Sequence, residues 1–266
     1  NALYRRACAA GDLTLTIYTA LTLQKPTGHN FHERRFMGPF AERVFGNYPD
    51  LEYEMDRVAG RLPRNVRVIE FYFPAGKFLR NPVAQRDYIS SNYTHAARDL
   101  LARGVNVLMQ QVATGRVEGR RKMSLSCNPD LSVDLMTALR RQQGEGRAIA
   151  FVVQTNAELP FMYGDAVVDP DDFHFIVDNR AQDYQIFGPP KMSVGDAEHA
   201  IGVHVASLIR DGGELQVGIG ALGDAVVYAL LLRHQHAETY ARAQRAFTEA
   251  EHAGDLVSRF GGREPF

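Results

Sequence analysis

The chain has 266 residues, of which 45% are hydrophobic and 23% charged, and its formal net charge is −1. This composition is that of an ordinary globular protein. A near-neutral charge gives no basic face for nucleic acid, and no apolar run reaches the ~18 residues that a membrane span needs. We therefore predict neither a nucleic-acid nor a membrane partner. The Arg-rich stretch 116–122 is interpreted as a solvated loop in preference to a polyanion site.

Strand-like and helix-like segments alternate along most of the chain. In chain order, strands are predicted at 13–19, 66–72, 105–112, 148–154, 173–177 and 215–219, and helices at 94–102, 197–210 and 224–247. The apolar run 148–154 is typical of a strand buried on both faces. The alternation predicts an α/β fold with an open, mostly parallel sheet and helices on both faces.

We expect residues 1–266 to form one such domain, truncated at both ends. The chain starts at Asn1 inside a helix-like stretch, and residues 261–266 end it without a closing element. Residues 20–62 are rich in Pro, Gly, His and aromatic side chains. This segment interrupts the alternation and is interpreted as an excursion from the sheet or a cap over it.

The two cysteines, Cys8 and Cys127, are too few for a disulfide framework and fit a reducing, cytoplasmic location. No histidine partner is assigned near Cys127, so a buried structural thiol is favoured over a nucleophile.

The histidines are also spaced poorly for a metal site. The pairs His29-x-x-His32 and His234-x-His236 each lack a third ligand at metal spacing, so no metal site is predicted.

The sharpest local feature is the glycine-rich stretch 216–224, which includes Gly218, Ile219 and Gly220. A predicted strand runs into glycines and then directly into a helix. Glycines let backbone N–H groups approach a ligand, and a helix start carries a partial positive charge. Such a turn can hold a phosphate or stabilise an oxyanion. A strand-to-helix turn that merely tolerates glycine explains the pattern equally well.

A second polar cluster follows the predicted strand 148–154. It contains Asn156 and Asp165. Ligands of open α/β sheets bind at the carboxyl ends of the strands, where these side chains could orient a substrate. The alternative is a loop in which Asn and Asp only cap local turns.

Taken together, the two blocks resemble the acetyl-CoA hydrolase/transferase branch of the class I CoA-transferases. Residues 216–225, after a helix that ends at 207–213, match one block of that family. Residues 150–165 are similar to its N-P-x-M-P-x-x-x-G-D region, and the order and spacing agree. The resemblance covers roughly residues 66–232. The chain departs from the family at 113–127, where the family often has S-P-P-D-x-x-G-x-x-S-L-G.

The resemblance implies two related open α/β halves with the active site between them, of which this chain is the N-terminal one. It implies CoA transfer from an acyl-CoA to a carboxylate or water through a glutamyl-CoA intermediate. Acyl-CoA and a small carboxylate are then the substrates, no covalently bound cofactor is needed, and a homo-oligomer is allowed. The CoA-binding residues would be Gly218, Ile219, Gly220 and Asn156.

The nucleophilic glutamate of that mechanism is expected beyond Phe266. The carboxylates that follow the glycine loop are not in the expected setting at a strand end: Glu238, Glu249, Glu251 and Glu264. The fragment alone is therefore expected to be inactive. A hypothesis from another class is a non-catalytic module that binds or senses a nucleotide or acyl-CoA.

Overall fold

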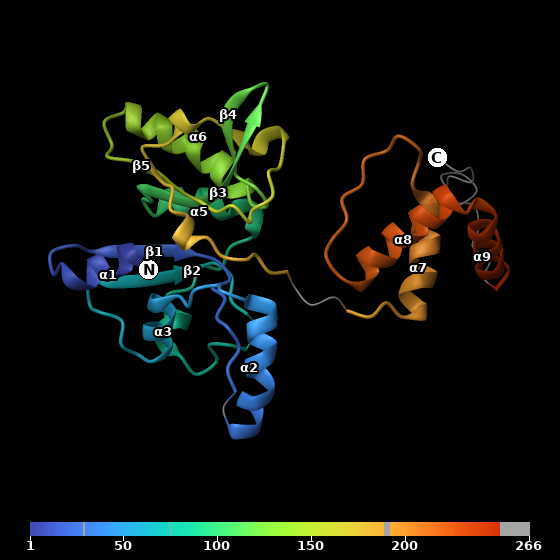
Figure 1. The fold of residues 1–266 in the computed structure, drawn as a ribbon, viewed down its shortest axis with the longest axis horizontal. Helices are drawn as coiled ribbons and strands as arrows, with labels where there is room; N and C mark the ends of the chain where they lie inside the picture. The colour runs from blue at the N-terminus through green and yellow to red at the C-terminus, as the bar shows by residue number, and fades with distance from the viewer. Residues whose placement is uncertain (29, 75, 189–191, 251–266) are drawn as a thin grey trace. The chain divides into compact units, whose positions relative to one another are not determined.

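The computed structural model describes residues 1–28, 30–74, 76–188 and 192–250, so His29, Glu251, Glu264 and the end segment 261–266 lie outside the described residues. The chain forms two compact units, Asn1–Phe187 and Gly188–Phe266 (Figure 1). One domain over residues 1–266 stays a prediction, and each unit is described by itself.

The first unit contains all the strands of the described chain. Its strands are β1 (Leu15–Thr19), β2 (Val66–Glu70), β3 (Val107–Val117), β4 (Arg120–Ser124), β5 (Ala150–Thr155), β6 (Val167–Val168) and β7 (Phe175–Val177). Its α-helices are α1 (Ala2–Ala9), α2 (Phe31–Phe45), α3 (Glu52–Val58), α4 (Pro82–Arg86), α5 (Ala96–Ala102) and α6 (Asp130–Gly144). Short 3-10 turns lie at Tyr93–His95, Gly164–Ala166, Pro170–Asp172 and Arg180–Gln182.

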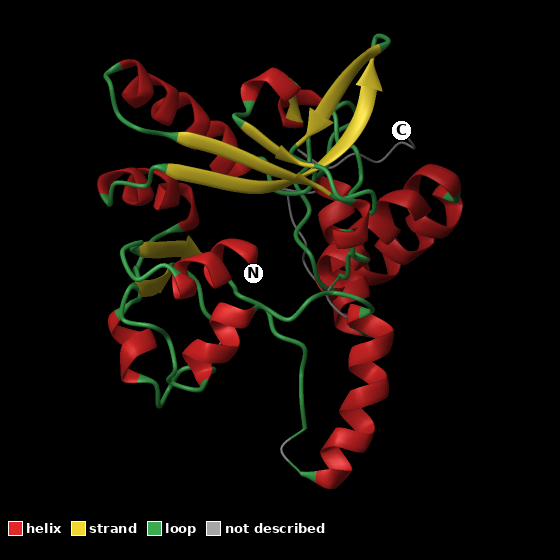
Figure 2. Ribbon diagram, turned by 60° about the vertical axis from the view of Figure 1, so that its left-hand side comes forward, coloured by secondary structure: helices red, strands yellow, loops and turns green. Residues whose placement is uncertain are grey.

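The strands form two sheets. β1 and β2 pair in parallel, and a second sheet has the order β6-β4-β3-β5-β7. β5 pairs in parallel with β3 and β7, whereas β4 is antiparallel to both its neighbours. Figure 2 shows the β3–β4 hairpin extending from this sheet. The predicted α/β class with a mostly parallel sheet is thus confirmed.

The Arg-rich stretch lies in this hairpin. β3 and β4 are joined by Glu118 and Gly119, both with positive φ (51° and 77°). Two such residues make the tight turn whose twist matches paired strands. The loop predicted at 116–122 is therefore two strand ends around a two-residue turn.

The main core lies between α5, α6 and the strands. Leu135 and Leu139 of α6 pack with Leu100 of α5 and Phe151 of β5. Along β5 every second residue is buried and the residues between are half-buried. The predicted burial on both faces of this strand is therefore wrong, because only one face is fully covered within the first unit.

Residues 20–62 contain α2 and α3, and a buried ion cluster joins α3 to β2. The Arg57 guanidinium pairs with Glu54, and it lies 2.6 Å from the Glu70 carboxylate, all three side chains being at most 2% exposed. Lys77 lies 2.6 Å from Glu54. Two cations thus compensate two carboxylates, which is the condition for burying charge at tolerable cost. The cluster fixes α3 against the first sheet. A cap function for 20–62 stays a prediction.

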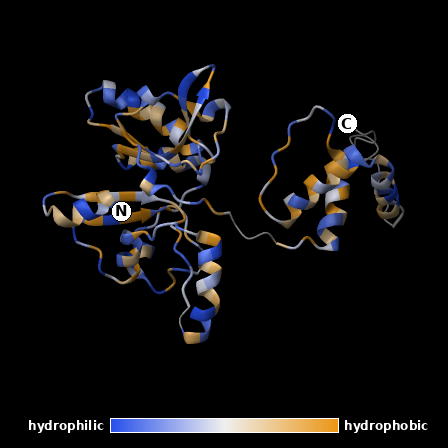
Figure 3. Cartoon of the chain, in the orientation of Figure 1, coloured by the Kyte–Doolittle hydropathy of each residue, from blue (hydrophilic) through white to orange (hydrophobic). Residues whose placement is uncertain are grey.

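The second unit consists of α7 (Asp196–Leu208), α8 (Ala221–Gln235) and α9 (Ala237–Ala250). Figure 3 shows α7 and α8 largely hydrophobic and α9 mostly hydrophilic. A Cβ at Gly202 would come within 2.6 Å of the Ala225 carbonyl, so glycine permits the close contact of α7 with α8. The buried Arg233 of α8 donates to the carbonyls of Ala206 and Ile209, satisfying the C-terminal end of α7.

Two predictions in this unit are corrected. Residues 215–219 are not a strand but an extended connection, and Leu215 and Val217 are exposed. A strand needs a neighbour for its backbone groups, and the described part of this unit contains none. The helix predicted over 224–247 is two helices, α8 and α9, which meet at His236. Among the described residues, no helix combines the length and apolar character needed to cross a membrane.

Candidate functional site: a cavity at the carboxyl ends of the strands

A cavity of about 570 Å³ opens in the first unit. It lies where β1 ends, beside the parallel part of β3 and the turn that leads into α6. Its volume is within the range of small-molecule sites. Its walls are mainly apolar, with a few hydroxyl, thiol and amide groups: Tyr18, Thr19, Ala20, Phe71, Tyr93, Leu100, Leu108, Met109, Gln110, Gln111, Leu125, Ser126, Cys127, Asn128, Leu131, Ser132, Leu135, Leu159, Ile186 and Phe187.

The turn after β4 forms one wall and is held by hydrogen bonds. Ser126 has φ +59°, a left-handed conformation that is uncommon for a residue with a side chain. Its backbone N–H donates to Ser124 Oγ (3.1 Å), and its hydroxyl donates to the Pro160 carbonyl (2.9 Å). The Gln110 amide donates to the carbonyls of Leu125 (2.9 Å) and Asn128 (3.1 Å). These bonds fix the turn and its unusual backbone.

Cys127 lies on this turn and is exposed, and it lines the cavity. The expected buried structural thiol is therefore wrong. The turn holds Ser124 and Ser126 inward, and both are buried. The next residue, Cys127, is left exposed at the cavity wall.

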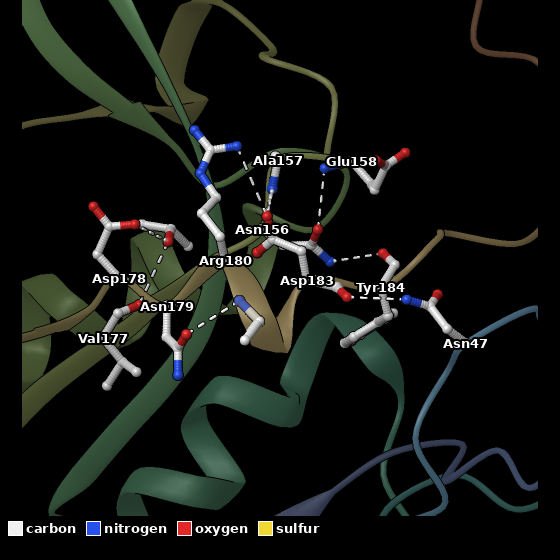
Figure 4. A network of polar contacts seen from close by, with 12 residues as sticks. Asn47, Asn156, Ala157, Glu158, Val177, Asp178, Asn179, Arg180, Asp183 and Tyr184 are labelled. Atoms are coloured by element: carbon white, nitrogen blue, oxygen red, sulfur yellow. Dashed lines mark hydrogen bonds and ion pairs between the residues drawn. The ribbon is translucent and has the colours of Figure 1, made fainter.

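The segment 183–187 reaches the cavity with Ile186 and Phe187, and its Tyr184 is hydrogen-bonded to β3 and to Asn156, the residue after β5 (Figure 4). The Asn156 Nδ2 donates to the Tyr184 carbonyl (3.1 Å), and the Tyr184 hydroxyl donates to Gln111 Oε1 (2.8 Å). Asn47 Nδ2 donates to the Asp183 carbonyl, and Asn47 Oδ1 accepts from Gln185 N–H. The wall is thus tied both to the sheet and to the connection between α2 and α3.

The candidate binding residue Asn156 is 1% exposed. Besides donating to Tyr184, its side chain accepts a hydrogen bond from the Glu158 backbone N–H (3.0 Å). The nitrogen and the oxygen of the Asn156 amide are therefore both hydrogen-bonded within the protein. This is the local capping that the sequence left as an alternative, and it also builds the wall of the cavity. Its role as a ligand-binding residue stays a prediction.

The glycine loop lies in the second unit. Ile219 is 91% exposed, and Gly220, the residue before α8, has φ +140°. A Cβ at Gly223 would come within 2.1 Å of the Gly218 carbonyl, whereas Gly218 and Gly220 face open space. Gly223 is thus required by the fold. Gly218 has no such packing reason to be glycine, so ligand binding there stays a prediction.

The predicted site residues are divided between the units, Asn156 in the first and Gly218, Ile219 and Gly220 in the second. Sequence reasoning missed the cavity itself. Its lining comes from separate segments, and the only local signal was the departure from the family pattern at 113–127. Of the carboxylates considered as nucleophiles, Glu238 is exposed in the first turn of α9 and Glu249 lies near the end of that helix.

Comparison with known proteins gives the relationship. No protein-family model matches the chain. It is 40% identical over 79 residues to the 4-hydroxybutyrate coenzyme A transferase of Clostridium kluyveri, a match that covers 30% of this chain and 18% of that protein. Over these 79 residues the chain is related to a CoA-transferase.

Solved structures agree on the fold. The crystal structure of RipA from Yersinia pestis matches 86% of this chain and 54% of that chain, with 19% identity and a TM-score of 0.50. A RipA mutant matches 85% and 51%, with 17% identity and a TM-score of 0.53. The chain therefore spans about half the length of the solved structures it matches.

Proposed function

We propose that this chain is the acyl-CoA-binding half of a CoA-transferase or acyl-CoA hydrolase. The match to a 4-hydroxybutyrate CoA-transferase carries the proposal. The cavity supports it, because its lining includes the carboxyl end of β1 and Leu159 from the segment after β5, and ligands of α/β sheets bind beyond such strand ends. The open backbone at Gly218 also suits the approach of a thioester or phosphate.

In the proposed reaction a glutamate carboxylate attacks the thioester carbon and expels CoA as its thiolate, which leaves an acyl-glutamyl anhydride. The thiolate then attacks the glutamyl carbonyl, releasing the first carboxylate and forming glutamyl-CoA. An acceptor carboxylate then attacks the glutamyl-CoA carbonyl and displaces the CoA thiolate, which leaves a second acyl-glutamyl anhydride. The thiolate attacks the acyl carbonyl of this anhydride, giving the new acyl-CoA and the free glutamate; water in place of the acceptor gives free glutamate and free CoA. Covalent catalysis of this kind divides one difficult transfer into easier steps. The glutamate is expected outside this chain.

A second candidate is a non-catalytic module that binds acyl-CoA or a nucleotide. One observation favours it: among the described residues that line the cavity, none has a carboxylate that could act as the nucleophile. Such a module would still bind its ligand but would have no turnover with any partner chain.

Binding to the purified chain tests the proposal. We expect butyryl-CoA to bind in isothermal titration calorimetry at least tenfold more tightly than ADP, since acyl and pantetheine groups would add buried apolar area to the nucleotide. ADP binding as tight as that of butyryl-CoA would support a nucleotide module. Absence of binding by any CoA ester would contradict the proposed function.

A further inference from the structure

The chemistry of the cavity wall points to a substrate class within the proposed function, on which this inference rests. We infer that the cavity takes an uncharged, apolar acyl chain of medium length. The matching substrate would be a monocarboxylic acyl group such as hexanoyl, whose chain fits within a cavity of about 570 Å³. Dicarboxylic acyl groups would be disfavoured.

The first argument is charge. Twenty residues line the cavity, and in this described lining not one is Asp, Glu, Lys, Arg or His. An anionic tail packed against the buried part of this wall, at Leu100, Leu125 and Leu135, would lose its water and gain no counter-ion, which is costly for a carboxylate. This part of the wall therefore disfavours a dicarboxylic acyl group.

The second argument is the use of the polar groups. The Gln110 amide already serves the carbonyls of Leu125 and Asn128 and accepts a hydrogen bond from Ser132. Gln111 accepts from Tyr184. These two amides are committed to building the wall, so a polar tail that reached them would have to break an existing hydrogen bond.

The third argument is shape. Leu108, Leu131, Leu135 and Leu159 come from β3, α6 and the segment after β5, and together they supply an aliphatic lining. Each methylene that leaves water for such a wall raises affinity roughly fourfold. Affinity should therefore increase along a series of acyl chains until the cavity is full.

Cys127 provides a direct reporter of occupancy. It is exposed at the cavity wall, and the other cysteine of the chain, Cys8, lies in α1. In a Cys8→Ser variant, alkylation by iodoacetamide, followed by mass spectrometry, reads out Cys127 alone. We expect hexanoyl-CoA and free hexanoate to slow alkylation. Succinyl-CoA and CoA alone should not slow it at the same concentrations.

Two variants at Leu159 test whether the charge of the wall sets the selectivity. Leu159 is a half-buried lining residue, so Leu159→Lys places a cation at the wall. We expect it to weaken protection by hexanoyl-CoA at least tenfold and to create protection by succinyl-CoA. The matched control Leu159→Met should keep the selectivity of the parent. Circular dichroism melts establish that both variants are folded.

Each outcome decides separately on the inference and on the proposed function. Equal protection by hexanoyl-CoA and succinyl-CoA in the parent overturns the inference but leaves acyl-CoA binding intact. Protection by CoA alone, as strong as by hexanoyl-CoA, overturns it as well, because the cavity would then hold the CoA arm. If free hexanoate protects but no CoA ester binds, the apolar cavity stands and the proposed function fails.

Discussion

Tyr48 shows how a single residue joins the wall of the cavity to the helices before it. Its ring lies 5.3 Å from that of Tyr184 and 5.1 Å from that of Phe187, centroid to centroid. Burial, followed by the neighbouring Tyr184, Tyr53 and Asp50, raises the pKa of Tyr48 to about 12. The phenol is therefore held in its neutral form well above the usual ionisation range.

This shift predicts a loss of stability at alkaline pH. An unfolded tyrosine ionises near pH ~10. The contribution of Tyr48 is therefore fully present below about pH 10 and is lost as pH rises towards about 12. Between pH 9 and higher pH, the free energy of unfolding measured with urea should fall by roughly 2 kcal/mol less in Tyr48→Phe than in the parent, because phenylalanine has no proton to lose. Tyr163→Phe, at an exposed tyrosine, is the control. An unchanged slope in Tyr48→Phe would show that this phenol does not govern the decline.

At the scale of elements, the connection into α8 contains glycines of two kinds. Gly223 packs on the Gly218 carbonyl, and a methyl group there would collide with backbone. At Gly218 a methyl group would meet no atom within 4 Å. Substitution at Gly223 therefore tests what the fold requires, whereas substitution at Gly218 tests what a ligand requires.

We predict opposite results for the two alanine variants. Gly223→Ala should lower the unfolding free energy by about 1–3 kcal/mol, because the chain must move to relieve the collision. Gly218→Ala should melt like the parent but bind acyl-CoA roughly 10- to 100-fold more weakly, if the ligand approaches this backbone. Gly144→Ala, also in open space, is the control. Normal acyl-CoA affinity in Gly218→Ala would leave the loop as a structural turn.

At the scale of the whole molecule, the binding cavity and the nucleophile are expected on different chains or halves. The described lining of the cavity offers hydroxyl, thiol and amide groups but no carboxylate. The chain covers about half of the solved structures it matches. Catalysis by the proposed mechanism therefore needs a carboxylate from elsewhere.

The isolated chain should accordingly have no turnover. Incubated with acetyl-CoA and a carboxylate acceptor, it should release no free thiol and form no exchanged thioester above a sample without protein. A parallel measurement of acyl-CoA binding checks that the same protein sample is able to bind the substrate. Turnover clearly above background would place the nucleophile among the carboxylates of this chain.

Sequence by itself determined those elements whose signal is local. The periodicity of 197–210 predicted α7, the alternating runs predicted β1 and β2, and a short apolar run predicted β5, because each of these signals lies within a few neighbouring residues. The resemblance to CoA-transferases was also contained in short blocks of sequence, and the match to a known transferase confirms it.

Tertiary structure decided what depends on partners distant in sequence. Residues 215–219 have the composition of a strand, but the described part of their unit has no strand to pair with. Cys127 is exposed, whereas its neighbour Ser126 is turned inward and hydrogen-bonded to Ser124 and Pro160. The cavity combines residues from β1, β3 and α6 with Ile186 and Phe187. No spacing along the chain encodes such an enclosure, since only packing brings these segments together.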